Sequence, residues 1–140
     1  MSLTTWKKEF YPEDAGKVSA KDALAHSLRK WEGILPENLK KHDVFLDEDH
    51  KLRGKKGPPM GYVTGNKTCA LCHHHWHYFI DTCDDCPLTA VGACCLDYNS
   101  PYERATKGMS KGKPLKPKLM ITALKRAQKY EAKQPRKVKR

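Results

Sequence analysis

All six cysteines of this 140-residue chain lie between positions 69 and 95. They are spaced as two C-x₂-C pairs and one adjacent pair: Cys69 and Cys72, Cys83 and Cys86, Cys94 and Cys95. A C-x₂-C turn places two thiolates on one side of a tight loop, and two such turns complete a tetrahedral sulfur shell around one ion. The spacing therefore predicts a structural metal site, and its ribbon-like form favours Zn²⁺.

The expected ligands are the first pair, Cys69 and Cys72, together with two of Cys83, Cys86 and Cys94. Because Cys95 is adjacent to Cys94, we expect it to pack as a small buried residue instead. The middle of the chain has few aliphatic residues, so burial alone would not fold it. Metal binding by thiolates is strong enough to order such a segment.

Disulfide bonds and redox chemistry are the main alternative uses of these cysteines. The N-terminus has no apolar stretch typical of a secretion signal, so an oxidising compartment is not indicated. A redox C-x₂-C motif normally occurs once, at a helix start in a βαβ unit that this sequence lacks. An iron–sulfur cluster stays open, because Pro87 follows Cys86 as in some ferredoxin loops.

A run of histidines follows the first cysteine pair: His73, His74, His75 and His77. On a helix, His73 and His77 lie four residues apart on one face, which makes them possible metal ligands. The same run could serve a metal-dependent nuclease of the HNH type. However, ten residues separate the two C-x₂-C pairs, too few for the ββ hairpin and helix of such a site. We therefore predict no catalytic residue and favour a non-enzymatic protein.

The positive charge of the chain is concentrated near its C-terminal end. The net charge is +11, from 27 Lys and Arg against 16 Asp and Glu. Residues 104–140 hold 14 basic residues and one acid, Glu131. Such asymmetry is typical of a nucleic-acid contact made through phosphates. The residues expected to make it are Lys111, Lys113, Lys116, Lys118, Lys125, Arg126, Lys129, Arg136, Lys137, Lys139 and Arg140.

Two other partners fit the same charge pattern less directly. In one interpretation the basic region meets an acidic surface of a host protein, and the aromatic anchors are Trp6, Phe10, Trp76 and Tyr102. In the other it is a solvated tail that aids solubility. No apolar run is long enough to cross a membrane, so we expect no membrane partner and a cytoplasmic location.

The expected fold is a small α+β fold, mostly helical and irregular, in which a helical hairpin and a C-terminal helix surround the zinc knuckles. Residues 1–18 are expected to form an irregular strap on the core, residues 19–103 the core, and residues 104–140 a basic linker, helix and tail. Any strands should be short and lie near residues 60–80. Residues 47–67 and 100–117 are predicted to be loops.

The hairpin and the last helix have local signals of their own. A helix is predicted over Ser19–Trp31, with Ser19 and Asp22 as its capping box and Gly33 as its stop. A short second helix is expected over Glu37–His42. The last helix should run from Pro117 to about Ala132 with one apolar face made of Met120, Leu124, Ala127 and Tyr130.

The cysteine segment and its flanks also resemble a known group of proteins. The shared residues are Cys69-Ala-Leu-Cys72, Cys83-Asp-Asp-Cys86-Pro87-Leu88, Gly92 to Cys94, and Ser100-Pro101-Tyr102. They resemble the pattern C-x-L-C, C-x-x-C-P-L, G-x-x-C, S/T-P-Y of small bacteriophage proteins that look like zinc-binding proteins. The resemblance spans about residues 20–130 and implies a metal-stabilised phage protein in the host cytoplasm. The histidine run departs from that pattern.

Overall fold

The computed structural model describes residues 2–47, 51–61, 63–64, 69–75, 86–95, 100–106 and 115–133. Across these residues the chain is mostly helical with one two-stranded antiparallel sheet, which confirms the expectation of a small, mostly helical fold. No described helix is both long and apolar enough to cross a membrane. The elements in chain order are α1 (Leu3–Phe10), η1 (Ala15–Lys17), η2 (Ala20–Asp22), α2 (Ala23–Gly33), α3 (Pro36–His42), β1 (Phe45–Leu46), β2 (Leu52–Arg53), α4 (Ala70–His75), α5 (Pro87–Ala90), α6 (Pro101–Thr106) and α7 (Pro117–Lys133).

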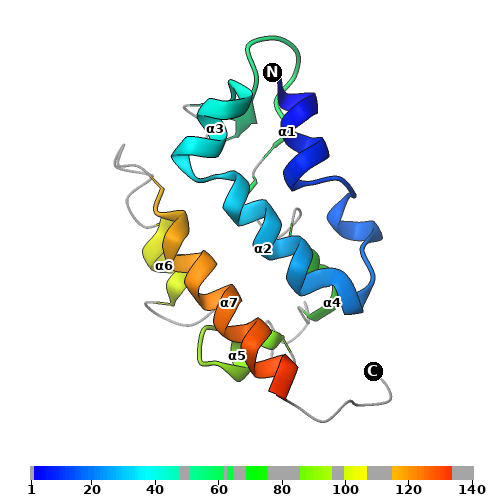
Figure 1. The fold of residues 1–140 in the computed structure, drawn as a ribbon, viewed down its shortest axis with the longest axis vertical. Helices are drawn as coiled ribbons and strands as arrows, with labels where there is room; N and C mark the ends of the chain where they lie inside the picture. Colours follow the sequence, from blue (N-terminus) through cyan, green and yellow to red (C-terminus); the bar gives the residue numbers. More distant parts are fainter. Residues whose placement is uncertain are drawn as a thin grey trace.

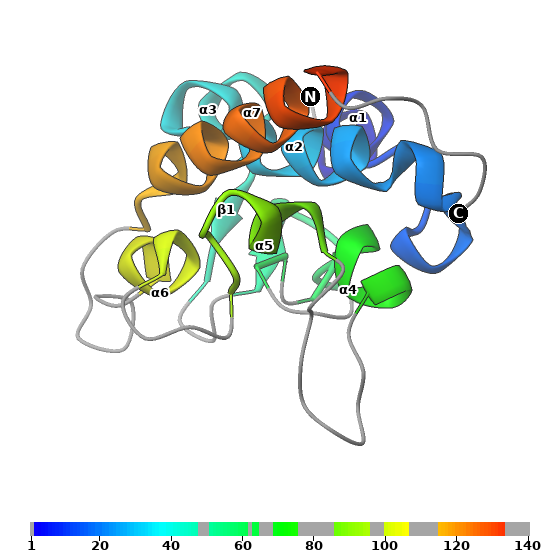
Figure 2. The ribbon, with the colours of Figure 1, turned by 90° about the horizontal axis from the view of Figure 1, so that it is seen from below.

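The elements form two layers that pack face to face (Figure 2). The helical layer consists of α1, α2, α3 and α7, with α2 running between α1 and α7 (Figure 1). The cysteine layer consists of α4, α5, α6 and the small sheet. Helix α4 packs against α2, while α5 and α6 pack against α7. The cysteine layer therefore packs on the two long helices, α2 and α7.

The N-terminal segment is a helix rather than an irregular strap. Ser2 Oγ accepts the Thr5 N–H at 3.2 Å and Thr5 Oγ1 accepts the Ser2 N–H at 2.9 Å, so the two residues form a capping box. Pro12 and Gly16 led to the prediction of an irregular segment, but the helix ends at Phe10, before both residues. The expected packing on the core is confirmed, since Trp6 and Phe10 are buried.

The start of α2 follows the predicted cap. Ser19 Oγ accepts the Asp22 N–H at 3.3 Å. The residues between them form a 3₁₀ turn, so the α-helix begins only at Ala23. Ser19 therefore caps the segment as expected, one turn before the α-helix itself.

Helix α2 ends at Gly33, as predicted, but Gly33 does not adopt the positive φ of a glycine helix stop. A Cβ at this position would lie 2.6 Å from Phe10 Cβ and 2.8 Å from Trp6 Cζ2. The Trp6 indole Nε1–H also donates to the Gly33 carbonyl oxygen at 2.9 Å. The glycine is thus required by the close approach of α1 to α2 rather than by a helix end.

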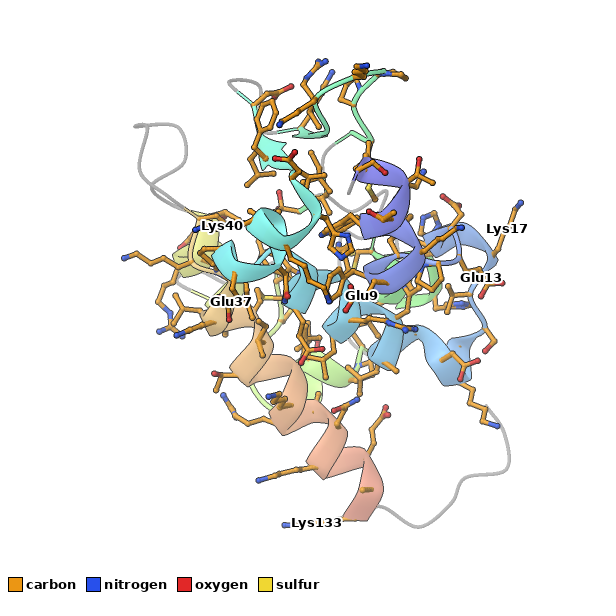
Figure 3. All side chains as sticks on the ribbon, turned by 45° about the horizontal axis from the view of Figure 1, so that its top comes forward. Glu9, Glu13, Lys17, Glu37, Lys40 and Lys133 are labelled. Atoms are coloured by element: carbon orange, nitrogen blue, oxygen red, sulfur yellow. The ribbon has the colours of Figure 1, made fainter. Side chains whose placement is uncertain are left out.

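Helix α3 is joined to α1 by a buried histidine. His42 is 3% exposed, and its Nε2 lies 2.7 Å from Glu9 Oε1. Its Nδ1 lies 2.9 Å from Thr5 Oγ1, and Lys41 Nζ lies 3.1 Å from Glu9 Oε1. Figure 3 shows Glu9 on α1, on the side that faces α3. The carboxylate therefore bridges the two helices.

Replacing Glu9 by glutamine is expected to remove part of the acid sensitivity of the fold. Hydrogen bonds from His42 and then Lys41 hold the pKa of Glu9 below its ordinary value of 4.5. Stability from a lowered carboxylate pKa is complete above the unfolded value and is lost as pH falls through the folded value. The Tm difference between wild type and Glu9→Gln, followed by circular dichroism, should be largest above about pH 5 and shrink at lower pH. A difference that is independent of pH would contradict this role.

Two regions predicted as loops contain short elements. Strands β1 and β2 pair antiparallel, with Phe45 opposite Arg53, and both lie upstream of the region where strands were expected. Gly61 forms an isolated β-bridge with Leu52. Strands of two residues are too short to produce a hydrophobic period, so the pattern could not locate them. Helix α6 begins after Ser100, whose Oγ accepts the Glu103 N–H at 3.2 Å.

Helix α7 runs over Pro117–Lys133, as predicted to within one residue. Met120, Leu124 and Ala127 are buried as expected. Tyr130 is 42% exposed, which contradicts its predicted place on the apolar face. All residues from 128 to 133 are exposed, so the packed part of the helix ends before Tyr130.

Candidate metal centre and nucleic-acid interface

Cys69 and Cys72 lie together against α2. Cys69 directly precedes α4, which packs on α2, and its Sγ lies 3.8 Å from Ser27 Oγ. The hydrogen bond from Cys72 lowers the pKa of Cys69 well below its ordinary value, with Lys30 and Ser27 adding to the effect against the opposing effect of burial. The thiolate is the form of cysteine that binds metals. This pair therefore has the chemistry predicted for half of a zinc shell.

The remaining cysteines occupy different surroundings. Cys86 is buried and caps the start of α5. Cys94 is buried in the apolar core, whereas Cys95 is half-buried at its edge. Cys83 lies outside the described residues. Within the part of the chain that the structure describes, no three His, Cys, Asp or Glu side chains are grouped closely enough to hold a metal ion.

Lys30 on α2 is buried and is influenced by the charges of three cysteines, Cys69, Cys72 and Cys95. Lys30 is completely buried on α2, one turn after Ser27. Burial lowers its pKa, while the charges of Cys69, Cys72 and Cys95 act to raise it. Its Nζ also lies 5.7 Å from the centroid of the Trp31 ring. The sequence prediction missed Lys30, because a lysine within an amphipathic helix is normally exposed.

Tyr102 on α6 is influenced by the same three cysteines and contacts Trp31 of α2. Its ring packs edge-on against Trp31 at a centroid distance of 6.3 Å. Burial raises the pKa of Tyr102, and the charges of Cys95, Cys72 and Cys69 raise it further. The three sulfurs therefore act on groups from two different helices, α2 and α6.

Within the histidine run, the structure describes the side chains of His73 and His74. Both lie beside the turns that precede α2. His74 Nε2 lies 2.5 Å from the Val18 carbonyl oxygen. A Cβ at Gly16 would lie 3.6 Å from His73 Cε1, so His73 lies beside η1. His77, the expected partner of His73 at a metal, lies outside the described residues. Both side chains are exposed, and the contact of His74 with Val18 links α4 to the turns before α2.

Thr5, His42 and Glu9 form a hydroxyl–imidazole–carboxylate series, the order of groups used by some nucleophilic enzymes. Here the Thr5 hydroxyl donates to the Ser2 carbonyl oxygen at 2.8 Å and accepts the Ser2 N–H. Its proton is thus engaged by the capping box and is not shared with His42. We interpret the series as a structural link between α1 and α3.

The exposed face of α7 is basic. Lys118, Lys125 and Lys129 are exposed at spacings of seven and four residues, so they form one stripe along the helix. The opposite face is buried and packs on α2, α5 and α6. Figure 3 shows Lys133 at the far end of the same helix. The stripe is therefore fixed on the folded domain.

Other predicted phosphate contacts divide into three groups. Lys116 is exposed just before α7. Arg126 Nη2 donates to the Val91 carbonyl oxygen at the end of α5, at 2.5 Å, and so has a structural contact as well. The rest lie outside the described residues: Lys111, Lys113, Arg136, Lys137, Lys139 and Arg140.

No protein-family model, curated protein or solved structure matches this chain. The resemblance to bacteriophage zinc-binding proteins stays a prediction that rests on the cysteine pattern and its flanks.

Proposed function

We propose that this chain is a zinc-stabilised, non-enzymatic binding protein that contacts nucleic acid through its basic C-terminal region. The observation that carries the proposal is the basic stripe of α7, formed by Lys118, Lys125 and Lys129. A stripe of ammonium groups on a rigid helix can follow a phosphate backbone, which binds without reading the sequence. The further basic residues on either side of α7 extend the same charge.

The zinc part of the proposal rests on the donor chemistry. Cys69 and Cys72 form a thiol pair that favours the thiolate of Cys69. Soft thiolate ligands fit Zn²⁺, and the remaining ligands are proposed from Cys83, Cys86 and the pair that follows α5. Free thiols of this kind belong to a reducing compartment. If the resemblance to phage proteins holds, that compartment is the host cytoplasm.

Replacing Lys118, Lys125 and Lys129 together by glutamine is expected to weaken nucleic-acid binding. Each lost phosphate contact removes about 0.9 from the slope of log K against log salt, so affinity at ~0.1 M salt should fall on the order of 10²-fold. Fluorescence anisotropy with a labelled duplex and a labelled single strand, over a salt series, measures both quantities. Circular dichroism checks that α7 remains folded.

The matched control replaces Lys7, Lys8 and Lys17 by glutamine, so it also removes three charges. All three are exposed, and they belong to α1 and η1, which lie on the far side of α2 from α7 (Figure 1). This variant should bind with nearly wild-type affinity and a salt slope close to that of wild type. Equal losses in the two variants would mean that overall charge decides binding. A pull-down partner that survives nuclease treatment would instead favour an acidic protein surface.

A further inference from the structure

Tyr130 is an exposed aromatic residue at the end of α7. It is 42% exposed, although Ala127, three residues earlier, is completely buried. Arg126 lies one turn before Tyr130 on the same side of the helix, and it donates to the Val91 carbonyl oxygen at the end of α5. All residues from 128 to 133 are exposed. The helix is therefore held on the domain up to the turn before Tyr130, and the ring lies just past the edge of the packed region.

The basic residues of α7 lie to one side of this ring. An α-helix turns by about 100° per residue, so the three lysines of the basic stripe lie within about 40° of one another around the axis. Lys133 lies about 40° beyond Lys129, and Tyr130 lies about 60° beyond Lys133 in the same direction. Glu131 lies about 100° further round, away from the lysines. The ring is thus separated from the basic stripe only by another exposed lysine (Figure 3).

An exposed ring beside a basic stripe matches a single-stranded nucleic acid better than a duplex. In a single strand, a base can stack on an aromatic side chain while the phosphates contact basic residues. In a duplex the bases are paired and stacked on one another, so a ring on the protein cannot stack on a base unless that base leaves the helix. The ring therefore adds affinity for a single strand and little for a duplex.

We propose that α7 binds single-stranded nucleic acid, with phosphates on the basic stripe and Lys133 and with one base stacked on Tyr130. The proposal rests on the proposed function, because the same lysines supply the phosphate contacts. It names the class of nucleic acid and adds an aromatic contact residue. Stacking of this kind tolerates any base, which agrees with a site that contacts phosphates rather than base edges.

Replacing Tyr130 by alanine tests the stacking contact. Binding is measured by fluorescence anisotropy with labelled oligothymidylate, labelled oligouridylate and a labelled duplex of the same length. Tyr130→Ala should lower the affinity for the single strand that wild type prefers by about 5–150-fold, the usual effect of losing one stacked base. The affinity for the duplex should stay close to wild type. The two single strands show whether DNA or RNA is the better ligand.

The salt dependence of binding separates stacking from charge. No phosphate contact is lost in Tyr130→Ala, so the slope of log K against log salt should equal that of wild type. Tyr130→Phe keeps the ring and should keep most of the affinity. Alanine is the stronger helix former at an exposed position, so α7 should stay folded, which circular dichroism checks. A reduced slope in Tyr130→Ala, or an equal loss of affinity in Tyr130→Phe, overturns the stacking contact.

A strand without bases gives an independent test of the same contact. An abasic strand keeps the phosphates and sugars but offers no base to the ring. Wild type should bind it more weakly than it binds oligothymidylate, whereas Tyr130→Ala should discriminate much less between the two strands, because the ring and the base act as a pair. Equal discrimination by wild type and Tyr130→Ala overturns the proposal.

Phe45 supplies the matched control. It is 45% exposed on β1, which follows α3 in the chain, and α3 and the end of α7 lie at opposite ends of the molecule (Figure 1). Phe45→Ala should bind every strand as wild type does, and equal losses in Phe45→Ala and Tyr130→Ala overturn the proposal. If wild type binds none of the strands, the proposed function itself fails. Tighter binding of wild type to the duplex, or unchanged single-strand affinity in Tyr130→Ala, refutes the single-strand assignment alone.

Discussion

Removing the ion of the proposed zinc centre is expected to abolish the cooperative unfolding transition of this protein. The described helices of the cysteine layer are only four to six residues long, and its strands have two residues each. Isolated helices shorter than about 12–15 residues are marginal in water. Zinc binding by thiolates contributes about 10–16 kcal/mol in small modules, which matches or exceeds the whole stability of a typical domain.

In the proposed centre Cys69 would hold the ion, and its Sγ lies 3.8 Å from Ser27 Oγ on α2. We therefore expect the damage to extend into α2 and the helical layer. Thermal unfolding followed by circular dichroism, before and after a zinc chelator, measures the effect, and elemental analysis confirms that the metal is gone. Added Zn²⁺ should restore the transition. An unchanged Tm in protein free of metal would contradict the central role of the zinc centre.

Replacing Gly33 by alanine is expected to lower the free energy of unfolding by about 3 kcal/mol, the upper part of the range for overpacked cores. The added Cβ would meet Phe10 Cβ at 2.6 Å and Trp6 Cζ2 at 2.8 Å. The neighbouring atoms belong to buried rings and to a side-chain Cβ next to the backbone, so α1 must move away from α2. The Trp6 hydrogen bond to the Gly33 carbonyl oxygen would be strained by the same movement.

The sign of this effect separates two explanations of Gly33. Helix propensity alone favours alanine over glycine by about 1 kcal/mol within a helix, and Gly33 is helical. Chemical denaturation of wild type and Gly33→Ala therefore decides the matter. A stabilised variant would show that α1 can adjust its position freely, against the packing described above.

Local sequence signals predicted those elements whose stability is itself local. Pro117 and the apolar spacing of Met120, Leu124 and Ala127 were sufficient for α7. The C-x₂-C spacing was sufficient to bring Cys69 and Cys72 together. Helix α1 was missed because Pro12 and Gly16 argue against a long helix, whereas α1 is short and ends at Phe10. Its capping box uses Thr5 in place of the usual Glu or Gln.

Other features depend on contacts between distant segments and leave no local pattern. Gly33 has the same sequence context whether it stops a helix or admits Trp6, which lies 27 residues away in the chain. In the sequence Lys30 resembles an exposed lysine. It is buried because distant segments of the chain pack on α2. Cys94 and Cys95 cannot be distinguished by spacing, because only the surrounding packing differs between them.

Helix α5 has only four residues, from Pro87 to Ala90. Cys86 caps its start, and the Val91 carbonyl oxygen just beyond its end accepts the hydrogen bond from Arg126 of α7. At 1.5 Å per residue this helix is about 6 Å long, and it separates Cys86 from the contact with α7. If Cys86 is a ligand of the proposed zinc centre, this short helix would connect the ion to α7.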